Sequence, residues 1–367
     1  MFTRSKLTSK LARRSRRGVH FRAGWGAIAP VLSWQVVLIL ASCAQPAREE
    51  AAPAPAVVER PSVVAANTVL CDLTQQIAGD TIELTCLLDY GQDPHVYKPS
   101  PSDRAAIDEA DLILYGGYQF EPSVIGMINA TPNSAPKIAV YEEAVPQPIL
   151  AQGHEHEHAH EEDSHEENAE SEGEPQPDPH VWQSAANNGA IATVLATHLS
   201  KAAPANASQY AQTAANLKTQ FAQLDQWMRQ QAETVPPANR TLVTTHDAFR
   251  YFSEAYGFEV GGVLSGLSTA EKPSAATLTE LVEEIKSAKV PAVFAEATTD
   301  PRLIETVARD AGVNVVSERL YDAGPGGPGT DGSTVQAMLA ANTCTIVNAL
   351  GGKCNVTSAP SQSEPSQ

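Results

Sequence analysis

The chain has 367 residues and a formal net charge of −18 at pH 7, with 43 Asp and Glu residues against 25 Lys and Arg residues. So acidic a surface repels the phosphate backbone of nucleic acids and attracts cations, which argues against nucleic acid as a partner. Residues 1–42 hold eight of the Lys and Arg residues and no acid, so a chain without them has a net charge near −26.

Residues 1–42 are predicted to be a signal peptide. A basic region precedes a short apolar run at 31–41, and the tetrad Leu40-Ala41-Ser42-Cys43 closes that run. The basic region consists of Arg13, Arg14, Arg16 and Arg17. A run of about 11 apolar residues is too short to cross a hydrocarbon core, which needs roughly 20. We therefore expect cleavage before Cys43 and lipidation of its thiol, which would hold the chain on a membrane surface outside the cytoplasm, in a periplasm or at the cell surface.

Residues 43–61 are rich in Ala, Pro and Glu without an apolar period, so we expect a flexible tether before the folded part. Four cysteines follow the tether, an even number in a chain predicted to leave the reducing cytosol. Four cysteines allow three pairings, and free buried thiols are the alternative. Local spacing favours Cys71 with Cys86 and Cys344 with Cys354.

Beyond the tether, β-branched runs alternate with amphipathic stretches, a pattern typical of parallel sheets flanked by helices. The pattern occurs twice and predicts an α/β fold of two Rossmann-like lobes, at 62–183 and 237–354. The expected strands are 62–67, 82–88, 112–115, 137–141, 241–245, 259–263, 292–296 and 314–317. The expected helices are one that opens with a capping box at Ser100-Pro101-Ser102-Asp103, and 274–288, 301–311 and 334–349.

Residues 184–236, between the two lobes, are dense in Ala, Gln and Leu and are expected to form linker helices with a break near Pro204. A helix of about 30 residues would span about 45 Å, so it could serve as a rigid connector between the lobes. The alternative is one more packing helix of a single domain. Residues 355–367 are expected to be a disordered tail.

Half of the ten histidines lie in one acidic tract within the loop predicted at 151–178. Eleven Asp and Glu residues surround these five histidines, which are His154, His156, His158, His160 and His165. Alternating His and Glu cannot build a core, so the tract should be a solvated loop. Five imidazoles at this density predict weak affinity for zinc, copper or nickel, whereas an ordinary charged linker is the alternative.

Three other histidines follow predicted strands, where open α/β sheets place their ligands. His95 and His180 share the tripeptide Asp-Pro-His, and His246 follows the strand predicted at 241–245. Proline fixes the backbone before each of the first two rings, and the adjacent Asp can hydrogen-bond to hold the turn. A single histidine is more often structural, but three at such positions predict a metal site, with Asp322 as a candidate fourth ligand.

The chain resembles the metal-binding lipoproteins of ABC importers for zinc, manganese or iron, known as cluster A-I solute-binding proteins. The matching stretches are 93–97 (DPHVY), 99–103 (PSPSD), 178–182 (DPHVW), 243–252 (VTTHDAFRYF), 268–274 (STAEKPS), 291–296 (PAVFAE) and 308–313 (ARDAGV). The resemblance covers about residues 63–350. It implies two lobes joined by a long helix, a metal ion bound in the cleft between them, and an ABC permease with its ATPase as partners of a monomer.

When the metal ligands of this family are placed on this sequence residue by residue, the resemblance implies that they are His95, His180, His246 and Asp322. Relatives usually have one more residue between the tyrosine and the aspartate, whereas Tyr321 here directly precedes Asp322. A glycine-rich segment at 324–329 also replaces the usual polar turn. Water or Glu296 is therefore an alternative fourth ligand, although we expect Glu296 to support a ligand rather than to bind the metal.

The third ligand of the family bears on the identity of the metal. Relatives that favour manganese often carry glutamate at the position of His246. Three imidazoles and at most one carboxylate suit tetrahedral zinc better than a harder ion. We therefore expect Zn²⁺ as the transported ligand, with Mn²⁺ or Fe²⁺ as alternatives, and capture rather than catalysis as the function.

Two further functions compete with the importer interpretation. A zinc hydrolase would also use three histidines and leave the fourth position to an activated water, with Glu296 as its best candidate base. No general-base motif stands beside a predicted ligand, and the lipid anchor and doubled lobes favour capture without an enzymatic reaction. The other competitor is a surface metal buffer or adhesin that acts without a transporter.

Overall fold

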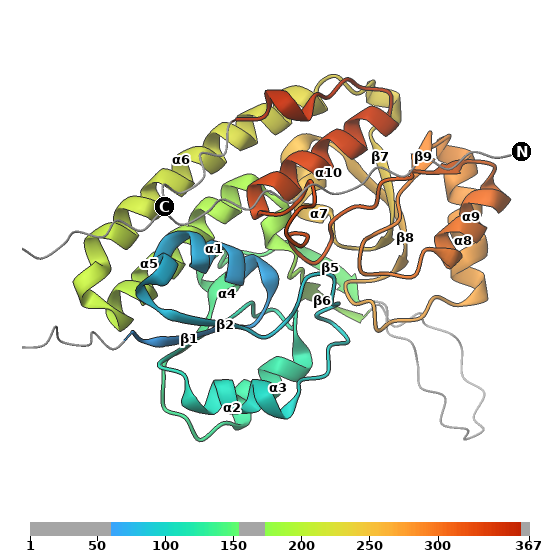
Figure 1. Ribbon diagram of the computed structural model, residues 1–367. Coiled ribbons are helices and arrows are strands. Elements are labelled where there is room, and N and C mark those ends of the chain that lie inside the picture. Colours follow the sequence, from blue (N-terminus) through green and yellow to red (C-terminus); the bar gives the residue numbers. More distant parts are fainter. Residues whose placement is uncertain (1–59, 154–172, 361–367) are drawn as a thin grey trace, which may run out of the picture. The chain divides into compact units, whose positions relative to one another are not determined.

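The computed structural model describes residues 60–153 and 173–360 (Figure 1). The predicted signal peptide, the tether with Cys43, and the tract with His154, His156, His158, His160 and His165 lie outside the described residues. Within the described ranges, no helix is both long and apolar enough to cross a membrane.

The first lobe is built on a four-stranded parallel sheet with the strand order β2-β1-β3-β4. Its strands are β1 (Ser62–Ala65), β2 (Glu83–Cys86), β3 (Leu112–Tyr115) and β4 (Lys137–Ala139). Alternate residues of β1 point to opposite faces of the sheet, so Val63 and Ala65 lie in one hydrophobic cluster and Val64 in another. Each face of the sheet is therefore covered by its own core.

Different helices cover the two faces of this sheet (Figure 1). The helices of the first lobe are α1 (Thr68–Ala78), α2 (Pro101–Glu109), α3 (Pro122–Ala130) and the short α4 (Val140–Ala144). The cluster on one face contains Ile107 of α2 and Val124 of α3, whereas α1 packs on the other face. The strand expected at 137–141 ends at Ala139 because α4 begins at the next residue.

The capping box predicted at the start of α2 is confirmed. The Ser100 hydroxyl accepts a hydrogen bond from the Asp103 backbone, and the Asp103 carboxylate accepts one from the Ser100 backbone at 2.6 Å. The same carboxylate accepts the hydroxyl of Tyr97 at 2.8 Å. Tyr97 lies two residues after His95, so the capping box also anchors the loop that carries this histidine.

Two long helices connect the lobes, α5 (Ala185–Ala202) and α6 (Ala207–Ala232), with a 3₁₀ turn at Pro204–Asn206 between them. At about 1.5 Å per residue, the 26 residues of α6 span roughly 39 Å. Its Tyr210 hydrogen-bonds Thr81 of the first lobe at 2.5 Å, and its Asp225 accepts the hydroxyl of Tyr256 in the second lobe at 3.1 Å. The helix therefore contacts both lobes, as a connector should.

The second lobe contains two pairs of parallel strands. They are β7 (Thr241–His246) with β8 (Glu259–Ser265), and β9 (Ala292–Val293) with β10 (Asn314–Val315). The Phe294 amide donates to the Val243 carbonyl at 2.9 Å, so β9 runs beside β7. The helices of this lobe are α7 (Arg250–Tyr256), α8 (Ala275–Ala288), α9 (Arg302–Ala311) and α10 (Val335–Ala349).

One part of the first lobe departs from the sequence prediction. The loop expected at 151–178 begins and ends in an antiparallel strand pair, β5 (Leu150–Gly153) and β6 (Gly173–Pro177). The expectation of a loop is therefore wrong for these residues, because their backbone groups pair with each other across the tract. The α/β fold with parallel sheets and long helices is confirmed, and all described residues fall in one compact unit. The proposed boundaries of the lobes stay a prediction.

The structure joins Cys71 to Cys86 and Cys344 to Cys354, the pairing that local spacing favoured. The first disulfide links α1 to β2, and the second links α10 to the segment that follows it. Residues 355–360 do not fit the expected disordered tail, since they include a 3₁₀ turn at Val356–Ser358. Ser358 accepts a hydrogen bond from the indole of Trp227 at 3.1 Å, which holds this turn against α6.

Candidate metal centre

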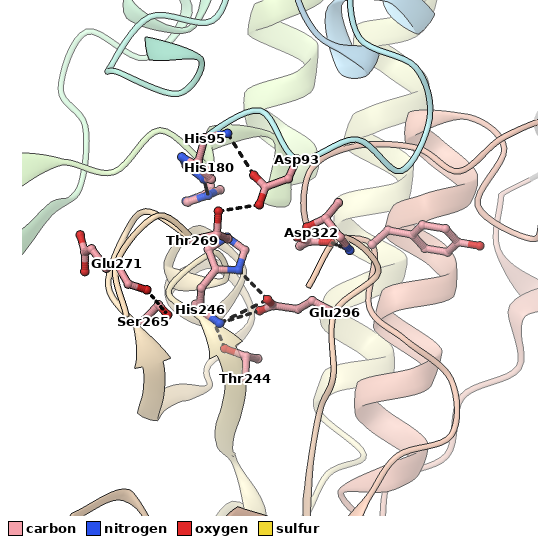
Figure 2. Close-up of polar contacts among 12 residues, drawn as sticks. Asp93, His95, His180, Thr244, His246, Ser265, Thr269, Glu271, Glu296 and Asp322 are labelled. Atoms are coloured by element: carbon pink, nitrogen blue, oxygen red, sulfur yellow. Dashed lines mark hydrogen bonds and ion pairs between the residues drawn. The ribbon is translucent and has the colours of Figure 1, made fainter. Parts of the chain in front are cut away.

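Three buried histidines from separate segments meet where strands of the two lobes end (Figure 2). His95 lies in the loop after β2, His180 follows β6, and His246 is the last residue of β7. One ring nitrogen of each lies within 4.8 Å of the others, and the Nε2 atoms of His95 and His180 are 3.2 Å apart. The ring centroids are separated by 5.2 to 5.7 Å. The nitrogens of the three imidazoles therefore converge on one point.

Both Asp-Pro-His tripeptides fold in the same way. In each, the Asp carboxylate accepts a hydrogen bond from the backbone N–H of the histidine two residues later. The distances are 3.0 Å from Asp93 to His95 and 2.8 Å from Asp178 to His180. Asp178 also lies 2.8 Å from Nδ1 of the His180 ring, which leaves Nε2 to face the other histidines.

Glu296 holds the third histidine. Its two carboxylate oxygens lie 3.1 and 3.2 Å from the backbone nitrogen of His246, and Oε2 is 2.5 Å from Nδ1 of the ring. Glu296 is fully buried three residues after the end of β9, the strand that runs beside β7. A carboxylate at Nδ1 holds the proton on that nitrogen and leaves Nε2 as the ring nitrogen that can bind a metal once its own proton has left. Glu296 therefore contacts His246 through both the ring and the backbone.

Asp322 forms a second group of possible ligands with His246 and Glu296, whose candidate atoms also lie within 4.8 Å of one another. Its carboxylate accepts hydrogen bonds from the backbone N–H of Thr298 at 3.2 Å and from the Thr298 hydroxyl. The side-chain amide of Gln183, at the end of the first lobe, donates to the Asp322 carbonyl at 3.3 Å. Asp322 is thus buried and fixed beside His246.

The glycine-rich segment after Asp322 wraps around the ring of Tyr321. A Cβ atom at Gly326 or Gly332 would lie 2.7 or 2.5 Å from this ring, so only glycine fits at these two positions without a shift. The Tyr321 hydroxyl donates to Asp331 at 2.6 Å. The unusual loop noted in the sequence therefore holds the residue that precedes Asp322.

The electrostatics of the three histidines differ. Burial, together with the nearby imidazoles, keeps the pKa of His95 and of His180 well below the usual value. Burial also opposes charge on His246, but Glu296, Asp322 and Asp93 outweigh it and raise its pKa to about 9. Near neutral pH the site therefore holds two neutral imidazoles and one ring that binds a proton, close to buried carboxylates. A divalent cation would replace that proton.

Aromatic side chains form the wall of the site in the first lobe. The ring of Phe120 meets those of His95 and His180 edge-on, with centroids 5.2 and 5.8 Å apart, and Trp182 lies 5.4 Å from His180. The next residue, Glu121, accepts the backbone N–H of Gly116 at 2.7 Å and so closes the turn that carries Phe120. This apolar wall shields the imidazoles from solvent on one side.

A family profile described as the periplasmic component A of a zinc-uptake complex, ZnuA, matches residues 63–349. The chain belongs to the ZnuA family.

Individual relatives of this ZnuA-family chain carry names for two metals. MntA of Bacillus subtilis (strain 168), named a manganese-binding lipoprotein, is 31% identical over 292 residues, which cover 78% of this chain and 89% of MntA. TroA of Treponema pallidum (strain Nichols), named a zinc-binding protein, is 32% identical over 297 residues, which cover 79% and 89% of the two chains. PsaA of Streptococcus mitis, named a manganese ABC transporter substrate-binding lipoprotein, is 28% identical over 287 residues, covering 78% and 87%.

The fold of this ZnuA-family chain matches that of a solved relative. The structure described as periplasmic zinc-binding protein TroA from Treponema pallidum aligns with a TM-score of 0.69 at 31% sequence identity. The alignment covers 79% of this chain and 99% of TroA. The described lobes and helices therefore follow the architecture of TroA.

The structure of this ZnuA-family member forms two groups from residues singled out in the sequence, which share His246. One group is His95, His180 and His246, and the other is His246, Glu296 and Asp322. Sequence reasoning missed Phe120, Trp182 and Thr269. Phe120 lies in a loop with no recurring pattern, and Trp182 and Thr269 fall in stretches quoted only for their family resemblance. The hydroxyl of Thr269 donates to Asp93, a contact between lobes that local spacing could not indicate.

Proposed function

We propose that this chain is the extracytoplasmic solute-binding component of an ABC importer, which captures a divalent transition metal ion and delivers it to the membrane permease. The observation that carries the proposal is the convergence of three buried imidazoles, two of them with neutral rings and the third, His246, beside the Asp322 carboxylate. Membership of the ZnuA family and the transporter name of PsaA support the importer role.

In this proposal, His95, His180 and His246 bind the metal through Nε2, and Asp322 supplies an oxygen ligand. Asp178 and Glu296 lie at the Nδ1 atoms of two of these rings. Such carboxylates fix the ring orientation and raise the basicity of the ligand nitrogen. The proton on His246 must leave when the ion binds, so acid should weaken binding.

Zinc is the proposed ion. MntA is named for manganese and TroA for zinc, so the names of these relatives do not indicate which metal this chain prefers. The donor set of three nitrogens and one oxygen matches the tetrahedral coordination that Zn²⁺ prefers, whereas Mn²⁺ favours more oxygen ligands. The ligand chemistry of this chain therefore supports zinc, with Mn²⁺ or Fe²⁺ as the competing ions to test.

A role in capture also agrees with the position of Glu296. A hydrolase would need a free base beside the metal-bound water. Both oxygens of Glu296 accept hydrogen bonds from His246, and its carboxylate is fully buried. Glu296 is thus engaged in holding a ligand, which argues for reversible binding rather than catalysis.

The remaining parts of the proposal concern the segments around the folded lobes. Lipidation of Cys43 would hold a monomeric chain at the membrane surface near its permease and ATPase, and the tether at 43–61 would let it reach them. The histidines of the acidic tract would collect metal ions loosely and raise their concentration near the site. The first experiment tests the tight site, because every other part depends on it.

Calorimetry and elemental analysis of the purified chain, stripped of metal, test the proposal directly. We expect one tight zinc ion per chain, which His246→Ala weakens at least about 100-fold because a ligand is lost. The matched control is His198→Ala, which removes a histidine that pairs with Glu143 away from the cluster. Equal zinc binding by wild type and His246→Ala contradicts the proposed site, and preferential binding of Mn²⁺ contradicts the choice of zinc.

A further inference from the structure

One side-chain hydrogen bond joins the two lobes directly beside the three histidines. The hydroxyl of Thr269, in the segment between β8 and α8, donates to Oδ2 of Asp93 at 2.5 Å. Figure 2 places Thr269 between His246 and the turn that carries Asp93 and His95. Thr269 thus reaches from the second lobe to the first across the candidate metal site.

Asp93 uses its two oxygens for different purposes. Oδ1 accepts the backbone N–H of His95 at 3.0 Å and so holds the turn, whereas Oδ2 takes the hydroxyl of Thr269. Thr269 is therefore bonded to the residue that positions a proposed ligand. A hydrogen bond to a carboxylate is stronger than one between neutral groups, so this contact is able to hold the segment in place.

The segment 266–273 is otherwise anchored to its own lobe. Glu271 accepts the Gly266 backbone N–H at 3.0 Å through its carboxylate and the Ser265 hydroxyl at 3.1 Å through its carbonyl. The Gly266 carbonyl accepts the backbone N–H of Asp247 at 3.1 Å. Among the side-chain hydrogen bonds of the described residues, only the Thr269–Asp93 bond connects this segment to the first lobe. We call the segment 266–273 the strap. It is fixed to its own lobe by several hydrogen bonds and to the first lobe by one side-chain hydrogen bond.

A pocket of about 570 Å³ in the second lobe is lined in part by residues of the strap. Its lining includes His246, Thr269, Glu271 and Thr245, so one wall is a proposed ligand and another is the strap itself. The Glu271 carboxylate in this lining is negatively charged and can attract a hydrated cation.

We propose that Thr269 is the gate of the metal site, and that its hydrogen bond to Asp93 closes the passage between this pocket and the three histidines. Breaking this bond lets the strap move away from His95 and opens the passage for an ion to enter or leave. The inference rests on the proposed function, since it assigns the step that controls exchange at that same site. Thr269 is a positioning residue and not a ligand.

Stopped-flow exchange on the full chain tests the gate. Zinc release into excess chelator and zinc uptake by the metal-free chain are compared for wild type, Thr269→Val and Thr269→Ser. Valine keeps the shape but removes the donor, so we expect release and uptake to accelerate about 10- to 100-fold, the effect of losing one hydrogen bond to a charged group. Serine keeps the donor and should exchange zinc at nearly the wild-type rates.

The matched control is Thr279→Val, the same change on the exposed side of α8, which should leave both rates unaltered. Thermal unfolding of each variant verifies that the fold is retained. If Thr269→Val leaves release unchanged, or accelerates release alone, the gate is contradicted, since a contact that only stabilises the loaded state does not control entry. Wild-type chain that binds no zinc contradicts the proposed function itself, which separates the two failures.

Discussion

Nδ1 of His246, the last residue of β7, lies 2.5 Å from Oε2 of Glu296, which follows β9 by three residues, and both side chains are buried. The two residues are 50 positions apart in the sequence, so the contact depends on the pairing of the strands that carry them. It sets which ring nitrogen of His246 is free to bind a metal. The strength of the proposed site should therefore depend on a residue that does not itself bind the ion.

Glu296→Gln should weaken zinc binding about 10- to 100-fold, the usual cost of losing a carboxylate that supports a histidine ligand. Glutamine preserves the size of the side chain but carries no charge to raise the basicity of the imidazole. Competition with a chelator of known affinity measures the change. Glu318→Gln, at an exposed position of the same lobe, is the control and should bind zinc as wild type does. An unaltered affinity for Glu296→Gln would mean that Glu296 plays no part in holding the ligand.

Much of the fold could be predicted from the sequence because its signals are local. The helix expected at 334–349 forms over Val335–Ala349, and the strand expected at 112–115 is observed as Leu112–Tyr115. In both cases the run of apolar residues and the flanking turn or cap residues lie in one short segment. The disulfide pairs were also indicated by short separations, which are 15 and 10 residues.

What could not be predicted depends on contacts between distant segments or on irregular backbone. Thr269 and Asp93 are 176 residues apart, and no periodicity connects them. Phe120 follows two residues with positive φ, Tyr118 and Gln119, a conformation that is uncommon for such residues and gives no simple sequence signal. The histidines were found because proline and aspartate repeat beside two of them. Phe120, which shields the site, and Thr269, which is proposed to close it, have no such repeat beside them.

Gly324→Ala should destabilise the chain and loosen the contact between the lobes. Gly324 has a φ of 137°, and a Cβ atom there would lie 2.2 Å from the Thr68 hydroxyl at the start of α1. Urea unfolding should report a loss of about 1 to 3 kcal/mol from backbone strain and the clash together. Gly329→Ala is the matched control, because its φ is also positive at 87° but no atom lies within 4 Å of the added Cβ. A larger loss for Gly329→Ala than for Gly324→Ala would contradict the role of the contact.

Replacing both Cys71 and Cys86 by Ala should lower the free energy of unfolding by about 3 kcal/mol, because the disulfide closes a loop of roughly 15 residues in the unfolded chain. Zinc stoichiometry should be retained, since neither cysteine lies among the residues grouped as possible ligands. Denaturant unfolding and elemental analysis of the same sample measure both quantities. Loss of bound zinc from a variant that remains folded would mean that this disulfide shapes the metal site.

The stability of the chain should depend on pH through Asp72, on α1. Oδ2 of Asp72 accepts the backbone N–H of Val335 at 2.9 Å and the amide of Gln76 at 2.8 Å. Burial raises the pKa of Asp72 from 3.8 to about 6, although these two hydrogen bonds lower it. Because the folded pKa lies above the unfolded one, the protonated form favours folding. This contribution is complete below about pH 4 and is lost as the pH rises through about 6.

Asp72→Asn keeps an acceptor for Val335 but does not ionise, so it should escape this loss. The stability of the variant relative to wild type should rise by up to about 3 kcal/mol between pH 4 and pH 8, which corresponds to a shift of about two pKa units. Urea unfolding of both proteins at pH 4, 6 and 8 gives the difference, in which the contributions of all other titrating groups cancel. Asp80→Asn, at an exposed position just after α1, is the control. A difference between Asp72→Asn and wild type that stays constant across this range would show that the Asp72 carboxyl titrates alike in the folded and unfolded chains.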